Sequence, residues 1–314
     1  MTAILEGPQV QRLLIDLEPV VEVELNRHLS QAKEWFPHEY IPWSQGEDFA
    51  GPLDGSAWTP EQQRFSEAAR VSLIINLLTE DNLPSYHHEI ATLFGRDGAW
   101  GTWVGRWTAE EVRHGAAIRD YLLVTRAVDP VALERARMTH MEAGFEAIHP
   151  DTLSGLAYVS FQELATRVSH RNTGTATGDP IAEQLLARIA LDENLHMVFY
   201  RNVLAAAFDR EPDATMDAVW KTVRDFAMPG HGIEGFTRKA LQIAVEGIYD
   251  IRQHLDEVVL PVLRKWNVFE RTDLGPEGER TREQLAEYLV TTEQAAKRFE
   301  ERRDALKQRL ATQD

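Results

Sequence analysis

The sequence predicts an all-α fold, a four-helix bundle with additional flanking helices. Apolar residues recur at three- and four-residue spacing along nearly the whole chain of 314 residues, which is the period of an amphipathic helix. No segment has the alternating pattern of a convincing strand. Proline, glycine and capping residues separate the helical segments, and no linker divides them. We therefore expect one domain over residues 1–314, with its core at about 60–210 and accessory helices at about 9–35 and 211–310.

The first part of the chain supplies an accessory helix and the first core helix. An irregular segment rich in proline, glycine and aromatic residues follows the accessory helix at 37–58. The stretch Thr59–Gln62 then combines an N-cap residue, a first-turn proline and a capping-box glutamine, so it should open the next helix. That helix carries Glu80 and should be interrupted at Pro84, because proline removes a backbone donor.

The other core helices follow from the same signals. A turn at Gly95–Gly101 precedes a helix that ends before Asp129, and Asp179-Pro180 caps another helix that runs to about Phe208. The stretch Asn172–Gly178, rich in threonine and glycine, reads as a loop. The remaining helices are expected at about residues 130–148, 153–170, 213–227, 233–263 and 280–310.

Composition excludes several classes of protein. A net charge of −17 argues against nucleic-acid binding, which needs a basic surface. No apolar run reaches the ~18 residues of a membrane span, and no secretory signal opens the chain, so we expect a cytoplasmic protein. Cysteine is absent, which excludes disulfides, thiolate metal sites, iron–sulfur clusters and cysteine nucleophiles.

The most informative feature is one pattern that occurs twice. Each half of the core contains a glutamate, followed 31 or 30 positions later by a Glu-x-x-His motif. Residues three apart share one face of a helix, so each motif can bind one ion. Four carboxylates and two imidazoles from four helices are the ligands of a carboxylate-bridged di-iron centre in ferritin-like bundles. The expected metal ligands are Glu80, Glu111, His114, Glu163, Glu193 and His196.

A third Glu-x-x-His, Glu146–His149, does not share this register. Pro150 follows it directly and should place it at a helix end. With so many glutamates and histidines in the chain, one such match is expected by chance. We interpret Glu146 and His149 as a coincidence.

Five stretches carry a resemblance to the soluble acyl-acyl carrier protein desaturases of plant plastids and actinobacteria. They are Leu78–Tyr86, Trp107–Gly115, Ser160–Thr166, Ser169–Thr173 and Asp192–His196, and weaker similarity continues at Met228–His231 and Arg264–Val268. The resemblance spans roughly residues 30 to 300. Leu164 stands where the plant proteins have arginine, and the connection from Glu80 to Glu111 is shorter than theirs.

The resemblance implies a specific chemistry. One iron would be held by Glu80, Glu111 and His114 with Glu163 shared, and the other by Glu193 and His196 with Glu163 and Glu111. Two iron ions with O₂ would insert a double bond into a saturated fatty acyl chain. By the same resemblance Thr166 lies near the oxygen-binding side, and Trp35 and Asp192 belong to an electron-entry route.

The substrate and the partners are further expectations. Candidate residues for an apolar acyl tunnel are Ile90, Leu93, Phe94 and Leu156. The acyl chain would arrive on acyl carrier protein. The chain has no dinucleotide-binding motif of its own, so electrons should come from a separate donor, ferredoxin. A homodimer is expected from the family.

Two alternatives remain open at this level. The protein could be another di-iron oxygenase, a hydroxylase or N-oxygenase, or a non-catalytic ferritin-like iron-binding protein. A long apolar tunnel would favour the desaturase, a wide polar pocket the other oxygenase, and a cage-forming surface the iron-binding protein.

Overall fold

A computed structural model of the chain describes residues 7–147, 151–230 and 232–312. The described part is helical apart from loops and an isolated bridge between Phe49 and Ser56, which confirms the all-α prediction. The helices are α1 Gly7–Gln31, α2 Glu67–Asp81, α3 Leu83–Phe94, α4 Gly98–Val124, α5 Pro130–Ala143, α6 Thr152–Thr177, α7 Pro180–Phe208, α8 Pro212–Asp225, α9 Phe236–Glu246, α10 Ile251–Gln253, α11 Leu260–Lys265 and α12 Pro276–Ala311. Short 3₁₀ turns lie at Pro37–Glu39, Trp43–Gln45 and Pro60–Gln62, and a π-helical segment at His254–Val259 joins α10 to α11.

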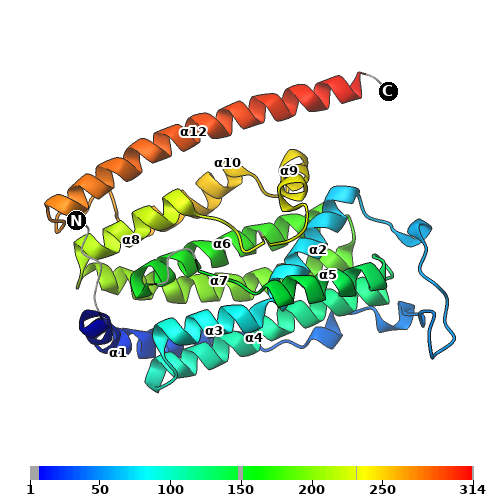
Figure 1. Ribbon diagram of the computed structural model, residues 1–314, viewed down its shortest axis with the longest axis horizontal. Helices are drawn as coiled ribbons and strands as arrows, with labels where there is room; N and C mark the ends of the chain where they lie inside the picture. Colours follow the sequence, from blue (N-terminus) through cyan, green and yellow to red (C-terminus); the bar gives the residue numbers. More distant parts are fainter. Residues whose placement is uncertain (1–6, 148–150, 231, 313–314) are drawn as a thin grey trace.

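Two helical hairpins form the bundle (Figure 1). The first consists of α2 and α4 with α3 between them in sequence, and the second consists of α6 and α7, which pack along their length. The helix α5 lies in the connection between the two hairpins. Across the bundle, α2 contacts α6 and α4 contacts α7. This arrangement brings the four helices that carry the expected ligands around one interior.

Local signals explain where these helices begin. The Ser66 side chain accepts a hydrogen bond from the backbone N–H of Ala69 at the start of α2. Asp151 and Asp179 accept backbone N–H bonds at the starts of α6 and α7. Each of these caps satisfies a donor that the first turn of a helix leaves free.

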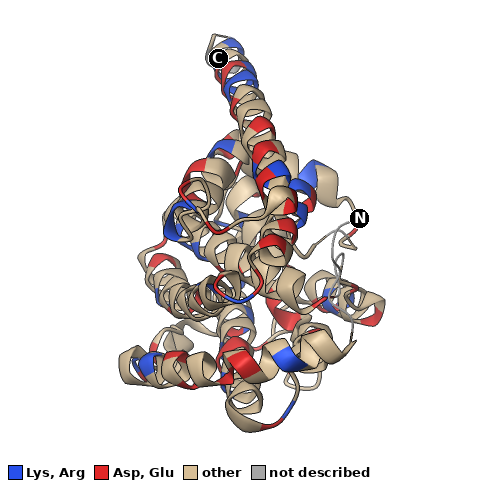
Figure 2. Ribbon diagram, turned by 90° about the vertical axis from the view of Figure 1, so that its left-hand side faces the viewer, with Lys and Arg blue, Asp and Glu red and all other residues tan. Residues whose placement is uncertain are grey.

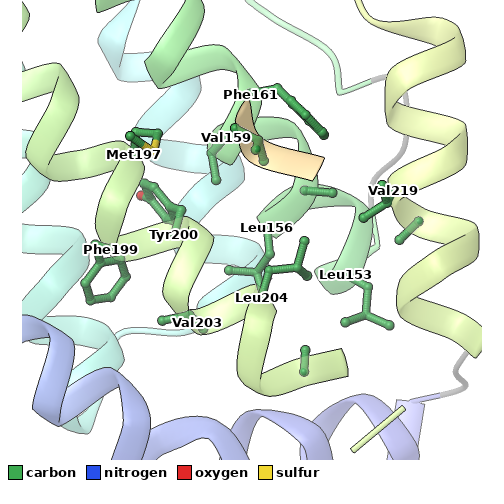
Figure 3. Close-up of a cluster of buried hydrophobic side chains, with 14 of the residues drawn as sticks. Leu153, Leu156, Val159, Phe161, Met197, Phe199, Tyr200, Val203, Leu204 and Val219 are labelled. Carbon is green, nitrogen blue, oxygen red and sulfur yellow. The ribbon is translucent and has the colours of Figure 1, made fainter. Parts of the chain in front are cut away.

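The accessory helices cover the bundle from two sides. Helix α1 packs against α4 and α7, and α8 packs against α6, α7 and α12. Figure 3 shows the apolar core where α6, α7 and α8 meet, formed by Leu153, Leu156, Val159, Phe161, Met197, Phe199, Tyr200, Val203, Leu204 and Val219. Basic and acidic residues are interleaved along α12 (Figure 2).

The predicted elements needed correction at four places. Helix α1 ends at Gln31, so Trp35 lies in the segment after it. The capping box of Thr59 and Gln62 closes one 3₁₀ turn, and α2 begins only at Glu67. The predicted loop 172–178 is helical up to Thr177, and the predicted helix 233–263 is divided at Gly247.

Two earlier observations fall partly outside the described residues. His149 of the third Glu-x-x-His and His231 of a resembling stretch are not among them. Glu146 is described and lies on the surface, outside helix. No helix in the described part of the chain is both long and apolar enough to cross a membrane.

Candidate metal centre

The bundle interior brings together all six residues of the duplicated pattern. Helix α2 contributes Glu80, α4 contributes Glu111 and His114, α6 contributes Glu163, and α7 contributes Glu193 and His196. All six side chains are buried. They form two overlapping groups in which the possible ligand atoms lie within 4.8 Å of one another: Glu80, Glu111, His114 and Glu193, and Glu111, Glu163, Glu193 and His196.

The Nδ1 atom of each histidine faces the carboxylates. His114 Nδ1 lies 3.1 Å from Glu193 Oε1 and 3.5 Å from Glu111 Oε2. His196 Nδ1 lies 2.8 Å from Glu111 Oε1 and 3.5 Å from Glu163 Oε2. Each imidazole therefore presents one ring nitrogen to a shared cluster of oxygens.

The sharing of carboxylates differs from the expected pattern. Glu163 was expected to serve both ions, but it belongs only to the group around His196. Glu193 belongs to both groups, together with Glu111. The carboxylates common to both groups are those of the two Glu-x-x-His motifs, and each single glutamate belongs to one group.

Four buried atoms at this cluster have no hydrogen-bond partner among the described residues. They are Glu111 Oε1, His114 Nδ1, Glu193 Oε1 and His196 Nδ1. The distances between these nitrogen and oxygen atoms are short, but their relative orientation does not suit a hydrogen bond. Buried polar atoms are normally paired, so four such atoms that face one another fit the binding of a cation.

The electrostatics of the cluster point to a cation. Burial, together with the negative charges of Glu111 and Glu163, raises the pKa of Glu193 well above its ordinary value. Burial alone would lower the pKa of His114, but Glu111 and the other acidic neighbours raise it well above the ordinary value. Carboxylate oxygen and imidazole nitrogen are ligands that suit divalent iron, manganese and zinc. The residues present fit a pair of divalent cations.

Each histidine is held from behind by the opposite motif. His196 Nε2 on α7 donates to Glu110 Oε2 on α4 at 2.9 Å. His114 Nε2 on α4 lies 3.4 Å from Asp192 Oδ2 on α7. A carboxylate can only accept, so Nε2 carries a proton, and Nδ1 is the nitrogen that can bind a metal in the neutral ring.

The two single glutamates also have fixed partners. His170 Nε2 lies 2.8 Å from Glu80 Oε1, and Trp107 Nε1 donates to Glu163 Oε1 at 3.0 Å. These bonds leave the second oxygen of each carboxylate facing the cluster. Partners of this kind orient metal ligands in known sites.

Trp35 and Asp192, expected in an electron-entry route, are in direct contact. Trp35 Nε1 donates to Asp192 Oδ2 at 2.7 Å. The guanidinium groups of Arg113 and Arg188 also bind Asp192. A continuous hydrogen-bonded path therefore runs from Trp35 through Asp192 to His114.

A pocket adjoins the cluster. Glu80, Glu111 and Glu163 are among its lining residues. The rest of its wall is largely apolar and includes Leu83, Ile90, Leu93, Val159, Phe226 and Met228. Of the expected tunnel residues, Ile90 and Leu93 are in the lining, whereas Phe94 and Leu156 are packed in the core and are not among the lining residues.

Thr166 lies on the pocket wall, one turn after Glu163. Its hydroxyl donates to the Gln162 carbonyl at 2.9 Å and accepts from Gln162 Nε2 at the same distance. The hydroxyl is thus bonded back to its own helix, as threonine often is in helices, while the side chain borders the pocket.

Sequence reasoning missed three supporting residues: His28, His170 and Trp107. Trp107 precedes Glu111 by one turn, and His170 follows Glu163 by two turns, so each lies on the same helix face as a ligand. The sequence spacing alone could therefore have identified Trp107 and His170. His28 had no such signal, because it belongs to α1, far from any ligand in sequence.

Comparison with known proteins decides the family. The profile of a family described as fatty acid desaturase matches residues 9–313. The acyl-[acyl-carrier-protein] desaturase DesA1 of Mycobacterium tuberculosis (strain H37Rv) is 54% identical over 297 residues, which cover 92% of this chain and 88% of that protein. The chain belongs to the acyl-ACP desaturase family.

Other members of this oxidoreductase family are similar over most of the chain. The stearoyl-[acyl-carrier-protein] 9-desaturase 3 of Arabidopsis thaliana is 30% identical over 311 residues, covering 93% of this chain and 73% of the plant protein. The crystal structure of acyl-ACP desaturase DesA2 from Mycobacterium tuberculosis H37Rv matches with a TM-score of 0.71 and 32% identity. It covers 86% of this chain and 99% of DesA2. The ferritin-like fold expected from the ligand pattern is therefore confirmed.

Proposed function

We propose that this protein inserts a cis double bond into a saturated fatty acyl chain carried by acyl carrier protein, at a centre of two iron ions. The observation that carries the proposal is the pocket: three carboxylates of the ligand cluster line a pocket whose wall is otherwise largely apolar. An acyl chain needs such a wall, and its reacting methylene groups must lie beside the metal.

The six buried residues are the proposed ligands. One ion would be held by Glu80 and His114 and the other by Glu163 and His196, while Glu111 and Glu193 belong to both ligand groups. Bound iron would supply the O₂ chemistry that breaks an unactivated C–H bond, which side chains alone cannot do. The hydrogen bonds from His170 and Trp107 fix the two terminal carboxylates. Apolar residues around the pocket exclude water from the reacting carbons.

The electron balance requires an external donor. One O₂ becomes two waters by taking two hydrogens and their electrons from the acyl chain, and two further electrons and two protons from elsewhere. The chain has no cysteine and no dinucleotide-binding motif, so we assign the donor role to ferredoxin. The path Trp35–Asp192–His114 is the proposed entry route.

We further propose that residues 1–314 form one domain and that the protein is a homodimer.

The apolar wall favours the desaturase over the alternatives. A hydroxylase or N-oxygenase acting on a small polar molecule needs polar groups that orient its substrate. Here the polar lining residues outside the ligand cluster are outnumbered by apolar and aromatic ones; they include Thr79, Glu89, Gln162, Thr166, Thr222 and Asp225. A non-catalytic iron-binding protein would have no use for an apolar pocket beside its ligands.

A reconstituted reaction tests the proposal. The iron-loaded protein is mixed with stearoyl-ACP, O₂, ferredoxin and its reductase, and the released fatty acids are analysed by gas chromatography–mass spectrometry. We expect a mono-unsaturated product that disappears when ferredoxin is omitted. A hydroxylated product, or no product from protein that holds its iron and is supplied with reduced ferredoxin, would contradict the proposal.

A further inference from the structure

His28 on α1 contacts the outer side of the metal centre. Its side chain is fully buried, and its Nε2 lies 2.9 Å from Glu110 Oε2. The same carboxylate oxygen lies 2.9 Å from His196 Nε2. The other oxygen, Oε1, is paired with the Arg106 guanidinium. Glu110 is therefore held by groups from three directions: α1, α7 and its own helix.

The direction of these hydrogen bonds follows from chemistry. A carboxylate accepts and does not donate, so His28 and His196 both donate from Nε2 to one oxygen of Glu110. In the neutral ring of His196 the proton is then on Nε2, and the lone pair is on Nδ1, the atom that faces Glu111 and Glu163. The position of Glu110 thus determines which nitrogen of His196 is available to a metal, and His28 helps to fix that position.

The arrangement is matched on the other side of the centre. There Trp35 Nε1 donates to Asp192, the carboxylate behind His114. His28 and Trp35 are only seven positions apart in the N-terminal segment. One segment, packed against the two helices that carry the Glu-x-x-His motifs, therefore supplies an N–H donor to both supporting carboxylates.

The three residues His28, Glu110 and His196 do not form a third metal site. Both imidazole Nε2 atoms lie at hydrogen-bond distance from one carboxylate oxygen. The Arg106 guanidinium already supplies the positive charge at the other oxygen. A cation there would replace hydrogen bonds that are already made.

A packing role alone does not account for a histidine at this position. The ring packs against Trp103 and His196, with ring centroids 5.1 and 5.7 Å away. Its Nδ1 is buried and has no hydrogen-bond partner among the described residues. Burying an unpaired polar atom costs free energy, so an apolar residue would fill the space at lower cost. The bond to Glu110 is what a histidine adds.

We propose that His28 is a positioning residue of the metal centre, which keeps Glu110 against His196 from α1 as Trp35 keeps Asp192 against His114. This inference rests on the proposed function, because it assigns His196 to a metal. Loss of a group that orients a metal ligand typically weakens metal binding by about 10- to 100-fold. We expect that loss for the ion bound by His196.

Cobalt binding provides the test without turnover. Co²⁺ alone is titrated into wild-type protein and into His28→Phe, His28→Gln and Leu25→Ala in competition with a chelator, and the visible absorption of the bound ion is recorded. His28→Phe keeps an aromatic ring but has no donor. His28→Gln can place an N–H near Glu110. Leu25→Ala removes buried surface from α1 one turn away, outside the hydrogen-bond network.

The outcomes separate the two proposals. We expect His28→Phe to weaken one of the two Co²⁺ sites about 10- to 100-fold and to change its absorption bands, with His28→Gln and Leu25→Ala close to wild type. Equal binding by His28→Phe and wild type would overturn the inference. So would an equal loss in Leu25→Ala, or the same loss in a folded His28→Gln. If wild-type protein binds no Co²⁺ through Glu111 and Glu193, the proposed function itself fails.

Discussion

The supporting contacts of His114 and His196, the two proposed histidine ligands, cross the bundle. Glu110 on α4 serves His196 on α7, and Asp192 on α7 serves His114 on α4. Each supporting carboxylate immediately precedes the shared glutamate of its own motif. Consecutive residues on a helix point about 100° apart, so one can face the interior while the other reaches a neighbouring helix. The acidic residue before each Glu-x-x-His therefore has a defined role.

Thr166 offers a test of a residue that borders both the ligands and the pocket. We expect Thr166→Val to keep its iron, since the hydroxyl bonds only to Gln162, and to lower the fraction of O₂ consumption that yields product. O₂ uptake and product are measured together. Ser160→Ala is the matched control, because its hydroxyl bonds back to Leu156 on the same helix, away from the pocket. Equal coupling in both variants would assign Thr166 a purely structural role.

His254 predicts a pH dependence of stability. Its ring is partly buried, accepts a hydrogen bond from the Tyr249 hydroxyl at 2.9 Å and stacks on Phe226. Burial lowers its pKa from 6.5 to about 4. Between these values the unfolded chain binds a proton that the folded chain does not, so the free energy of unfolding falls as the pH falls from about 6.5 to 4, by up to about 3 kcal/mol.

Urea unfolding of wild-type protein and His254→Gln between about pH 7 and 5 measures this dependence. Glutamine keeps an acceptor for Tyr249 and does not titrate. We expect the wild-type protein to lose more stability than the variant over this range. Parallel profiles would mean that His254 takes up its proton equally in both states.

At the scale of the elements, sequence signals located the helices better than their ends. The capping box at Thr59–Gln62 is real, but it closes a 3₁₀ turn, because the chain bends again before Ser66 caps α2. The stretch 172–178 looked like a loop because threonine and glycine are poor helix formers. In the structure Thr173 is buried and bonds to Ser72 on α2. Tertiary contacts of this kind cannot be predicted from local propensity.

Gly174 shows why that stretch contains glycine. A Cβ at this position would lie 3.1 Å from the Glu183 backbone and 3.3 Å from Leu186 Cβ, both on α7. We expect Gly174→Ala to destabilise the protein by about 1–3 kcal/mol, because α6 and α7 would be forced apart. Urea unfolding measures the effect.

The control for this change is Gly105→Ala on α4, where an added Cβ meets nothing within 4 Å. Alanine favours helix over glycine by about 1 kcal/mol, so Gly105→Ala should stabilise the protein. Two stabilising substitutions would show that α6 and α7 are not as closely packed at Gly174 as described.

At the scale of the whole molecule, the duplicated spacing was enough to predict the six residues that meet in the interior. A repeat of about 30 residues fits ligands near the middle of two antiparallel helices. The sharing pattern was not predictable in this way, because it depends on how the two hairpins are placed relative to each other. The lining of the pocket was not predictable from the sequence either. Phe94 and Leu156 are apolar but lie in the core, whereas Ile90 and Leu93 reach the pocket.

The number of iron ions bound per chain tests the central claim most directly. Wild-type protein and single variants are loaded with Fe²⁺ without oxygen, freed of unbound metal and analysed for iron. We expect two ions in wild type and in Glu146→Ala, whose side chain lies outside the cluster on the surface. Glu163→Ala should keep about one ion, because Glu163 belongs to one ligand group. Glu111→Ala should bind least, because Glu111 belongs to both. Two ions in Glu111→Ala, or iron loss in Glu146→Ala alone, would contradict the ligand assignment.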